Sequence, residues 1–482
     1  MGNHHLYELV IGLEVHAQLM TESKLFCADA AAYGAAPNTQ VSPISLAHPG
    51  TLPKLNKKAI ELAVKLGLAL HCEIEKNNYF ARKNYFYPDL PKGFQISQHT
   101  APICKNGLIT IQTEGGSKNI LLNRIHIEED AGKSIHDLDE HSTCIDLNRS
   151  GVALLEIVTE PVMHSADEAY SFLTELRKIV RWLDVCDGNM EEGSMRCDAN
   201  ISIRLKGDQT LGKRVEVKNL NSIRNVKKAI EIEFDRLVQL QENNQPIIQE
   251  TRSFDADHQT TFTLRSKADA DDYRYFPEPD LPPFLIDEQY IQSIFSTLPL
   301  LPEEKKALYC KSLNLTAYDA SQICAEKEDV LFFDELITHT NHFKTAANWF
   351  IGPIKCYCQE NQLALSAFPL SKEKIAELIA LTALGTVQFN IASQKILPLM
   401  MANTQETAMS IAQQLNLIQE KDEIALSAWI DEVLQSMPEK VKAYKSGKKG
   451  LIGLFSGAVK KISNGKADMQ LVNEMLERYL NQ

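Results

Sequence analysis

The chain has 482 residues, a length typical of about three domains, and its 50 Lys and Arg against 63 Asp and Glu give a net charge of −13. Hydrophobic residues make up 44% and charged residues 23%, a globular composition that excludes wholesale disorder and fibrous folds. The acidic balance also argues against a protein that coats nucleic acid non-specifically, because neutralising phosphates requires a basic surface.

The first thirty residues do not resemble a signal peptide, because Glu8, Glu14 and His16 interrupt every apolar stretch. No later run approaches the ~20 apolar residues of a membrane span. Ten cysteines are too sparse for a disulfide scaffold, so we expect reduced thiols. The predicted compartment is the cytoplasm, without a membrane partner.

The N-terminal part alternates apolar and polar residues in short runs, which predicts strands with one face turned to a polar site, at 13–19, 152–158, 201–204 and 214–218. One helix is predicted from Ser165, with Glu168 completing a capping box. A second spans about Ile223 to Leu240, with inward residues Val226, Ile230, Phe234 and Leu237. Strands and helices at irregular spacing favour an α+β fold with a mixed or antiparallel sheet.

The Pro-rich stretch Pro277–Pro283 marks a boundary, because proline continues neither a helix nor a central strand. Helical segments follow, at Glu303–Cys310, Val330–His339, Ala346–Asn361 and Lys372–Ala383. A second joint falls near Met401–Thr407. We therefore predict domains at residues 1–292, 293–404 and 405–482, the last two all-α.

Three polar groups stand out against apolar surroundings in the N-terminal part. Glu14 and His16 are two apart in a strand and point to one face, Glu128, Glu129 and Asp130 are consecutive, and Glu156 lies in an apolar run. Side chains of this kind are costly to bury alone, and acids that repel one another suit a hard divalent cation, usually Mg²⁺ when phosphates are present. The alternative is a surface strand edge or a satisfied ion pair.

Phosphate-binding signals are weaker. Gly132-Lys133-Ser134 looks like the end of a phosphate loop, but Ile127 stands where a Walker A loop needs glycine. Arg196 precedes a strand in a polar segment, and Lys218 leads into a helix whose N-terminus suits an anion. Taken singly, each is more often part of a turn or solvated loop.

These polar segments occur in a fixed order between Leu9 and Pro283, and they resemble the signature blocks of the GatB family, the B subunits of glutamine-dependent aspartyl/glutamyl-tRNA amidotransferases. The matching blocks are GLEVHAQL, FARKNYFYPDLPKGFQISQ, HIEEDAGKS, DLNRSGVALLEIVTEP, EEGSMRCDANIS, EVKNLNS and DDYRYFPEPDLPP. Long blocks in a fixed order are far more specific than a single short motif.

The resemblance implies a catalytic cradle related to glutamine synthetase, a helical domain and a tail that helps to hold tRNA. It also implies that ATP and Mg²⁺ are used to phosphorylate the side-chain carboxylate of Glu or Asp wrongly esterified to tRNA(Gln) or tRNA(Asn). Ammonia from a partner amidase, the A subunit, would then displace phosphate. A small third chain, the C subunit, would bind both larger chains in a heterotrimer.

The same resemblance assigns roles to individual residues. His16, Glu129 and Glu156 are the expected Mg²⁺ ligands, with Glu14 and Glu128 as neighbours or second-metal ligands. Lys83 and Glu129 match positions at the mouth of the ammonia passage. Together with the metal ligand Glu156, they are the predicted catalytic residues. Phosphate roles for Lys133, Arg196 and Lys218 are inferred from charge alone.

The chain departs from the family at one place. Some members carry a zinc knuckle, but here only Cys27 remains, with Ser42 and Ser45 in the second block, so too few thiolates exist for a tetrahedral set. We predict no structural zinc.

The C-terminal segment from Lys440 to Gln482 carries nine Lys and Arg against three Asp and Glu, or +6, which leaves −19 on the rest. A solvated helical face is the ordinary explanation. In a family whose tail meets tRNA, the expected backbone contacts are Lys440, Lys442, Lys445, Lys448, Lys449, Lys460 and Lys461.

Two alternatives remain open. The chain could be a tRNA-docking scaffold whose acidic clusters are structural ion pairs. It could also be a stand-alone ligase acting on a free amino acid, although such an enzyme would have little use for two helical domains.

Overall fold

The computed structural model divides into two compact units, Met1–Leu301 and Pro302–Gln482. It describes residues 4–136, 138–266, 273–420, 422–463 and 466–481. Asp271 and Asp272, which begin the last signature block, lie outside the described residues. The division into three domains stays a prediction.

The first unit is built on a 13-stranded sheet whose main path runs β15-β14-β13-β12-β1-β11-β8-β5-β4-β16. Among its described strands only β13 and β14 pair in parallel, so the sheet is mixed. The strands on this path are β1 (Tyr7–Gln18), β4 (Ala81–Asn84), β5 (Phe94–Ser97), β8 (Gly116–Glu129), β11 (Ala153–Thr159), β12 (Met195–Leu205), β13 (Val215–Leu220), β14 (Glu250–Asp255), β15 (Thr260–Ser266) and β16 (Phe276–Pro277).

Shorter strands complete the unit. The remaining strands of the large sheet are β2 (Glu73–Ile74), β6 (Cys104–Lys105) and β7 (Leu108–Thr113). Two small sheets pair β9 (Lys133–Ile135) with β10 (Cys144–Asp146), and β3 (Asn77–Asn78) with β17 (Phe284–Leu285). A large mixed sheet followed by helices confirms the predicted combination of strands and helices.

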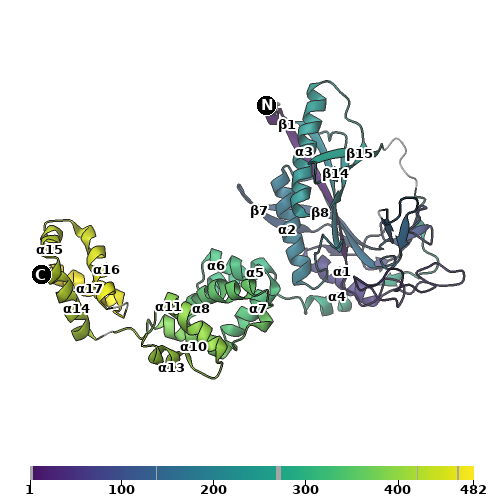
Figure 1. Cartoon of the computed structure of the whole chain (residues 1–482). Helices are drawn as coiled ribbons and strands as arrows, with labels where there is room; N and C mark the ends of the chain where they lie inside the picture. The colour runs from purple at the N-terminus through teal and green to yellow at the C-terminus, as the bar shows by residue number, and fades with distance from the viewer. Residues whose placement is uncertain (1–3, 137, 267–272, 421, 464–465, 482) are drawn as a thin grey trace. The chain divides into compact units, whose positions relative to one another are not determined.

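The sheet has one apolar and one polar face. In β1 the side chains of Leu13, Val15 and Ala17 are buried, whereas Glu14 and His16, which alternate with them, face the other way. Figure 1 shows three helices lying along the sheet, and these are α1 (Lys57–Ala69), α2 (Ala166–Trp182) and α3 (Ile223–Glu242). The helices leave the polar face free for a site.

Helix α2 begins as predicted, but its cap differs in detail. The hydroxyl of Ser165 accepts the backbone N–H of Glu168 at 3.1 Å. The carboxylate of Glu168 accepts the backbone N–H of His164 at 2.7 Å and pairs with Lys118, so it does not close a reciprocal box on Ser165. The predicted capping box is therefore modified: the Glu168 side chain bonds the backbone N–H of His164, one residue before the N-cap Ser165.

Helix α3 buries an acid where an aromatic residue was predicted. Phe234 is only half-buried, whereas the neighbouring Glu233 is fully buried. Its carboxylate accepts hydrogen bonds from Arg236 Nη2 at 2.7 Å, from Arg252 Nε of β14 at 3.1 Å and from the hydroxyl of Thr261 of β15. This network ties α3 to the edge of the sheet, which periodicity alone could not reveal.

A helical region follows the sheet, as expected. It contains α4 (Glu288–Phe295), α5 (Pro302–Ser312), α6 (Ala317–Ile323), α7 (Lys327–Leu336), α8 (Phe343–Trp349), α9 (Lys355–Glu360), α10 (Lys372–Ala383), α11 (Phe389–Ile391), α12 (Leu397–Ala402), α13 (Ala408–Gln414), α14 (Glu423–Ser436), α15 (Pro438–Lys445), α16 (Ile452–Ile462) and α17 (Met469–Asn481). The single helix predicted at Ala346–Asn361 is interrupted by a π-helical turn at Phe350–Ile354, which contains Pro353.

The last four helices enclose a hydrophobic core of their own, formed around Leu426, Ile430, Phe455, Val472 and Leu476. In the part of the chain that the structure describes, no helix has the length and apolar character needed to cross a membrane.

Replacing Glu233 with alanine tests the buried network. We expect Glu233→Ala to lower the free energy of unfolding by about 3–5 kcal/mol, because it removes the buried carboxylate that Arg236, Arg252 and Thr261 share and leaves Arg252 with only Glu250 as a carboxylate partner. Denaturant unfolding of the full chain measures this. The control Lys227→Ala, which removes the exposed partner of Asp167, is expected to leave the unfolding midpoint unchanged. Equal midpoints for the two variants would contradict the assignment.

Candidate active site

Strand register places four polar residues in one row across the sheet. Arg196 of β12 lies opposite His16 of β1, His16 lies opposite Glu156 of β11, and Glu156 lies opposite His126 of β8. Residues directly opposite in antiparallel strands point to the same face and lie within side-chain reach. Segments distant in sequence therefore converge on one point of the polar face.

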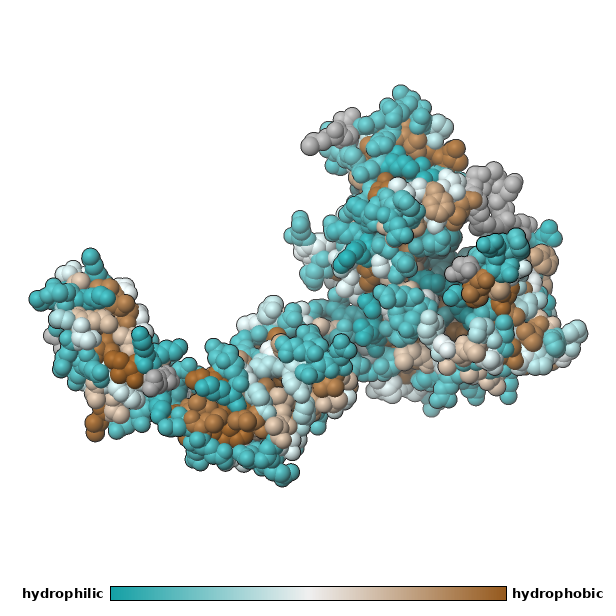
Figure 2. Space-filling model, in the orientation of Figure 1, coloured by the Kyte–Doolittle hydropathy of each residue, from teal (hydrophilic) through white to brown (hydrophobic). Residues whose placement is uncertain are grey.

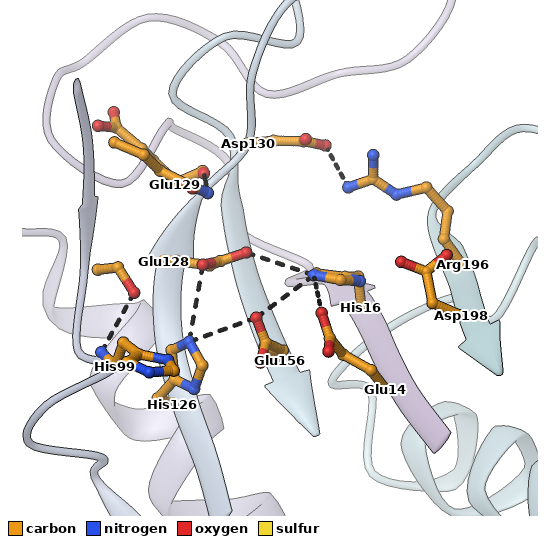
Figure 3. Close-up of polar contacts among 12 residues, drawn as sticks. Glu14, His16, His99, His126, Glu128, Glu129, Asp130, Glu156, Arg196 and Asp198 are labelled. Carbon is orange, nitrogen blue, oxygen red and sulfur yellow. Dashed lines mark hydrogen bonds and ion pairs between the residues drawn. The ribbon is translucent and has the colours of Figure 1, made fainter. Parts of the chain in front are cut away.

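Glu128 joins this row from β8, two residues beyond His126 and on the same face. The Nε2 atom of His16 lies 3.5 Å from Glu128 Oε1 and 3.5 Å from Glu156 Oε2, with Glu14 Oε1 at 3.9 Å. His126 Nε2 lies 3.6 Å from Glu128 Oε2 and 3.5 Å from Glu156 Oε2. Figure 3 shows the two carboxylates between the two imidazoles.

The electrostatics of this cluster favour a positive charge at its centre. Burial lowers the pKa of His16, but its close contacts with the carboxylates of Glu128 and Glu156 outweigh it and raise the pKa to about 10. Burial raises the pKa of Glu156, but the His126 and His16 rings outweigh it and lower the pKa to about 2. The same two rings hold the pKa of Glu128 well below its ordinary value against the effect of burial. Both carboxylates stay ionised, and the proton on His16 balances part of their charge.

His16, Glu128 and Glu156 offer one nitrogen and two carboxylate oxygens within 4.8 Å of one another. A hard divalent cation takes this kind of donor set, and it would displace the proton of His16 on binding. The residues present therefore fit a magnesium-type ion.

A second cluster shares His16. Glu14 and Asp198 are direct cross-strand partners, and they form a second possible ligand group with His16. Lys218 forms ion pairs with Asp198 and, at 3.1 Å, with Glu216. Asp198 was not predicted as a site residue, because the strand expected at 201–204 begins earlier, at Met195, and so carries Arg196 and Asp198 on the same face.

These groups surround a cavity of about 600 Å³. Its acidic lining residues are Glu14, Glu128, Asp130, Glu156 and Asp198, and its cationic ones are Lys83, Arg196 and Lys218. Burial lowers the pKa of each of the three cations, but neighbouring carboxylates outweigh it and raise the pKa above its usual value. The cavity therefore presents both signs of charge.

Two of the cations are held in defined positions. Arg196 Nη2 contacts Asp130 Oδ2 at 2.9 Å, and the same oxygen accepts Gln18 Nε2 at 3.0 Å. The ammonium of Lys83 lies 5.1 Å from the centre of the Tyr273 ring and 5.9 Å from that of Tyr85. These contacts leave both cations facing the cavity.

Glu129 does not join the predicted metal cluster. Neighbouring residues of a strand point to opposite faces, so Glu129 turns away from Glu128. Its carboxylate pairs with Lys92 and accepts the backbone N–H of Ile96 at 2.8 Å. Lys92 also lines a second cavity of about 230 Å³. The structure thus brings Glu128, not Glu129, to His16 and Glu156.

Lys133 is likewise separated from Arg196 and Lys218. It lies exposed in β9, outside the described residues that line the cavity. The loop-like sequence around it forms a small two-stranded sheet with β10 rather than a phosphate-binding turn.

Where some members of the resembling family carry a zinc knuckle, hydrogen bonds link Cys27, Asp29, Ser42 and Ser45 in this chain. Asp29 accepts the backbone N–H of Ser42 at 2.8 Å and the hydroxyl of Ser45, whose Oγ lies 3.4 Å from Cys27 Sγ. The fully buried Lys24 donates to the carbonyl of Leu147 at 3.2 Å. The absence of zinc stays a prediction.

The predicted tRNA-binding lysines are all exposed. They lie on α15, in the turn before α16 and near the end of α16, at Lys440, Lys442, Lys445, Lys448, Lys449, Lys460 and Lys461. Lys442 makes a 3.3 Å ion pair with Glu439 on the same helix, and Lys449 donates to Asn481 Oδ1 at 2.9 Å. The face of these helices seen in Figure 2 carries hydrophilic residues around a smaller apolar area.

Comparison with known proteins covers nearly the whole chain. Residues 9–292 match the GatB/GatE catalytic domain, and residues 331–480 match the GatB domain. Relatives named as the B subunit of aspartyl/glutamyl-tRNA(Asn/Gln) amidotransferase include one from Chlorobium phaeobacteroides (strain BS1), 45% identical over 98% of this chain and 99% of its own. Another, from Pelagibacter ubique (strain HTCC1062), is 43% identical over 99% of this chain and 97% of its own. The chain therefore belongs to the family of tRNA amidotransferase B subunits, as its sequence blocks predicted.

Proposed function

We propose that this chain uses ATP and Mg²⁺ to phosphorylate the side-chain carboxylate of Glu-tRNA(Gln), Asp-tRNA(Asn) or both, and then amidates it. The cavity of about 600 Å³ carries this proposal, because three cations and five carboxylates face one another there around His16. Such an arrangement suits a site that must bind phosphates, a cation and a carboxylate together.

The chemistry explains why both signs of charge are needed. A carboxylate does not accept ammonia directly, because oxide would have to leave. If a carboxylate oxygen attacks the γ-phosphorus of ATP, ADP departs and an acyl phosphate forms. Ammonia can then attack the acyl carbon, phosphate leaves with the C–O bonding electrons, and loss of a proton from nitrogen completes the amide.

In this proposal, one set of residues binds the metal ions and another binds the phosphate oxygens. His16, Glu128 and Glu156 would hold the first Mg²⁺, and Glu14 with Asp198 would complete a neighbouring site. Bound Mg²⁺ would neutralise phosphate oxygens and polarise the transferring group. Lys83, Arg196 and Lys218 would orient the remaining oxygens, since their raised pKa values keep them charged.

Ammonia would reach the cavity past Glu129 and Lys83. Glu129 is held by Lys92, which lines the second cavity, while its backbone carbonyl accepts the Nε2 of Gln95, which lines the first. A partner amidase, the A subunit, would supply the ammonia, and the small C subunit would bind both chains. In this proposal the large sheet serves as a cradle similar to that of glutamine synthetase.

The C-terminal helices would hold the tRNA. Their exposed lysines carry a local positive charge on an otherwise acidic chain, which suits contacts to the phosphate backbone rather than to bases.

The substitution Glu156→Gln tests the catalytic proposal, because it retains shape but removes one charge from the cation site. In the complex with the amidase and the small third chain, we expect ATP-dependent amidation of Glu-tRNA(Gln) and Asp-tRNA(Asn) to fall by about 100-fold or more. Assembly and tRNA binding should be retained. The matched control is Glu175→Gln on α2, which removes a charge that pairs with Lys178 away from the cavity.

A scaffold would respond differently. If Glu156→Gln amidated both tRNAs as fast as the Glu175→Gln control, the acidic cluster would be structural and the catalytic proposal would fail.

Reversing the charge of Lys440, Lys442 and Lys445 tests the tail. We expect the KM for aminoacyl-tRNA to rise. The slope of log KM against log salt concentration should decrease by about one unit for each phosphate contact that is lost. The KM for ATP should be unchanged. Charge reversal at the exposed lysines Lys206, Lys213 and Lys228 of the first unit is the control. Unaltered tRNA kinetics in the tail variant would exclude this surface as the tRNA site.

A further inference from the structure

His126 is a buried side chain whose polar atoms lack ordinary partners. It is fully buried, and neither ring nitrogen has a hydrogen-bond partner among the residues that the structure describes. A buried polar group in this state carries an uncompensated loss of hydration. A partner is therefore expected in the functional state of the protein.

The geometry identifies that partner. His126 Nε2 lies 3.6 Å from Glu128 Oε2 and 3.5 Å from Glu156 Oε2, a few tenths of an ångström beyond a normal hydrogen bond. His16 approaches the same two carboxylates from the other side. A small inward movement of either carboxylate would bring it within hydrogen-bond distance of His126.

Two further contacts hold the His126 ring in place. It makes a T-shaped contact with the ring of His99 at a centroid distance of 5.9 Å, and His99 in turn stacks on Tyr275 at 5.1 Å. Glu156 is its direct cross-strand neighbour. The imidazole is therefore oriented by packing, with Nε2 aimed at the carboxylates.

We propose that His126 is a positioning residue that holds the carboxylates of Glu128 and Glu156 in the geometry that binds a divalent cation. Its Nε2–H donates to them from the side opposite His16. Carboxylates that ligate a metal are commonly fixed by such outer hydrogen bonds. This inference rests on the proposed function, because it assumes that the two carboxylates hold the cation.

Two observations assign His126 to positioning rather than to direct ligation. His126 is not among the described residues that line the cavity, so a cation entering there meets Glu128 and Glu156 first. On the His126 side, Arg124 Nη2 already lies 3.5 Å from Glu156 Oε1, and its positive charge disfavours a second cation.

The experiment measures the affinity of the full-length chain for Mn²⁺, a spectroscopic substitute for Mg²⁺, from the free Mn²⁺ signal in electron paramagnetic resonance. The variants are His126→Gln, whose amide nitrogen reaches the position of Nε2, and His126→Asn, whose shorter side chain reaches only that of Nδ1. Both remove the ring and its packing on His99, so they differ mainly in the donor that faces the carboxylates.

We expect His126→Asn to weaken Mn²⁺ binding by about 10- to 100-fold and His126→Gln to restore most of the affinity. Ile127→Ala, which opens space at the next, fully buried position of β8, should leave the affinity unchanged. Circular dichroism of each variant verifies that the fold is retained.

The outcomes separate the two proposals. If Glu156→Gln abolishes Mn²⁺ binding while His126→Asn binds as the unchanged chain does, the positioning role is excluded and the proposed function stands. If folded His126→Gln and His126→Asn lose the same Mn²⁺ affinity, the positioning role is also excluded. The loss would then come from removal of the ring and its packing, not from the missing donor. If the unchanged chain does not bind Mn²⁺, both proposals fail.

Discussion

Mutual repulsion among carboxylates is the constraint on which the rest of this site depends. Five of them line one cavity, and two unit charges about 4 Å apart repel by about 4 kcal/mol at an effective dielectric constant of about 20. A few such pairs would equal the whole stability of a typical domain, which is about 5–15 kcal/mol. The cluster is tolerated because the positive charges of His16, Lys83, Arg196 and Lys218 offset it.

This compensation defines what the site can accept. His16 holds a proton well above its ordinary pKa, so the centre of the cluster accepts a cation, while Lys83 and Arg196 present positive charge to the same space. A cavity that presents charge of both signs is complementary to a ligand that carries both, such as a phosphate–metal complex.

Much of the site follows from local sequence, and the missing part has a physical cause. Alternation along β1 put Glu14 and His16 on one polar face, and an acid in an apolar run singled out Glu156. Among the adjacent acids of β8, composition could not choose between Glu128 and Glu129. The choice depends on which face of β8 is turned to the helices, because neighbouring residues of a strand point to opposite faces.

The sequence by itself determined the family, the succession of a sheet-rich part and a helical part, and the residue types on the polar face, because these depend on motif order and local periodicity. Tertiary structure alone decided which residues meet. Strand register aligned Arg196, His16, Glu156 and His126, which are far apart along the chain, and it turned Glu129 towards Lys92. Burial of Glu233 beside Arg252, and the separation of Lys133 from the cavity, likewise arise from long-range pairing that no local pattern encodes.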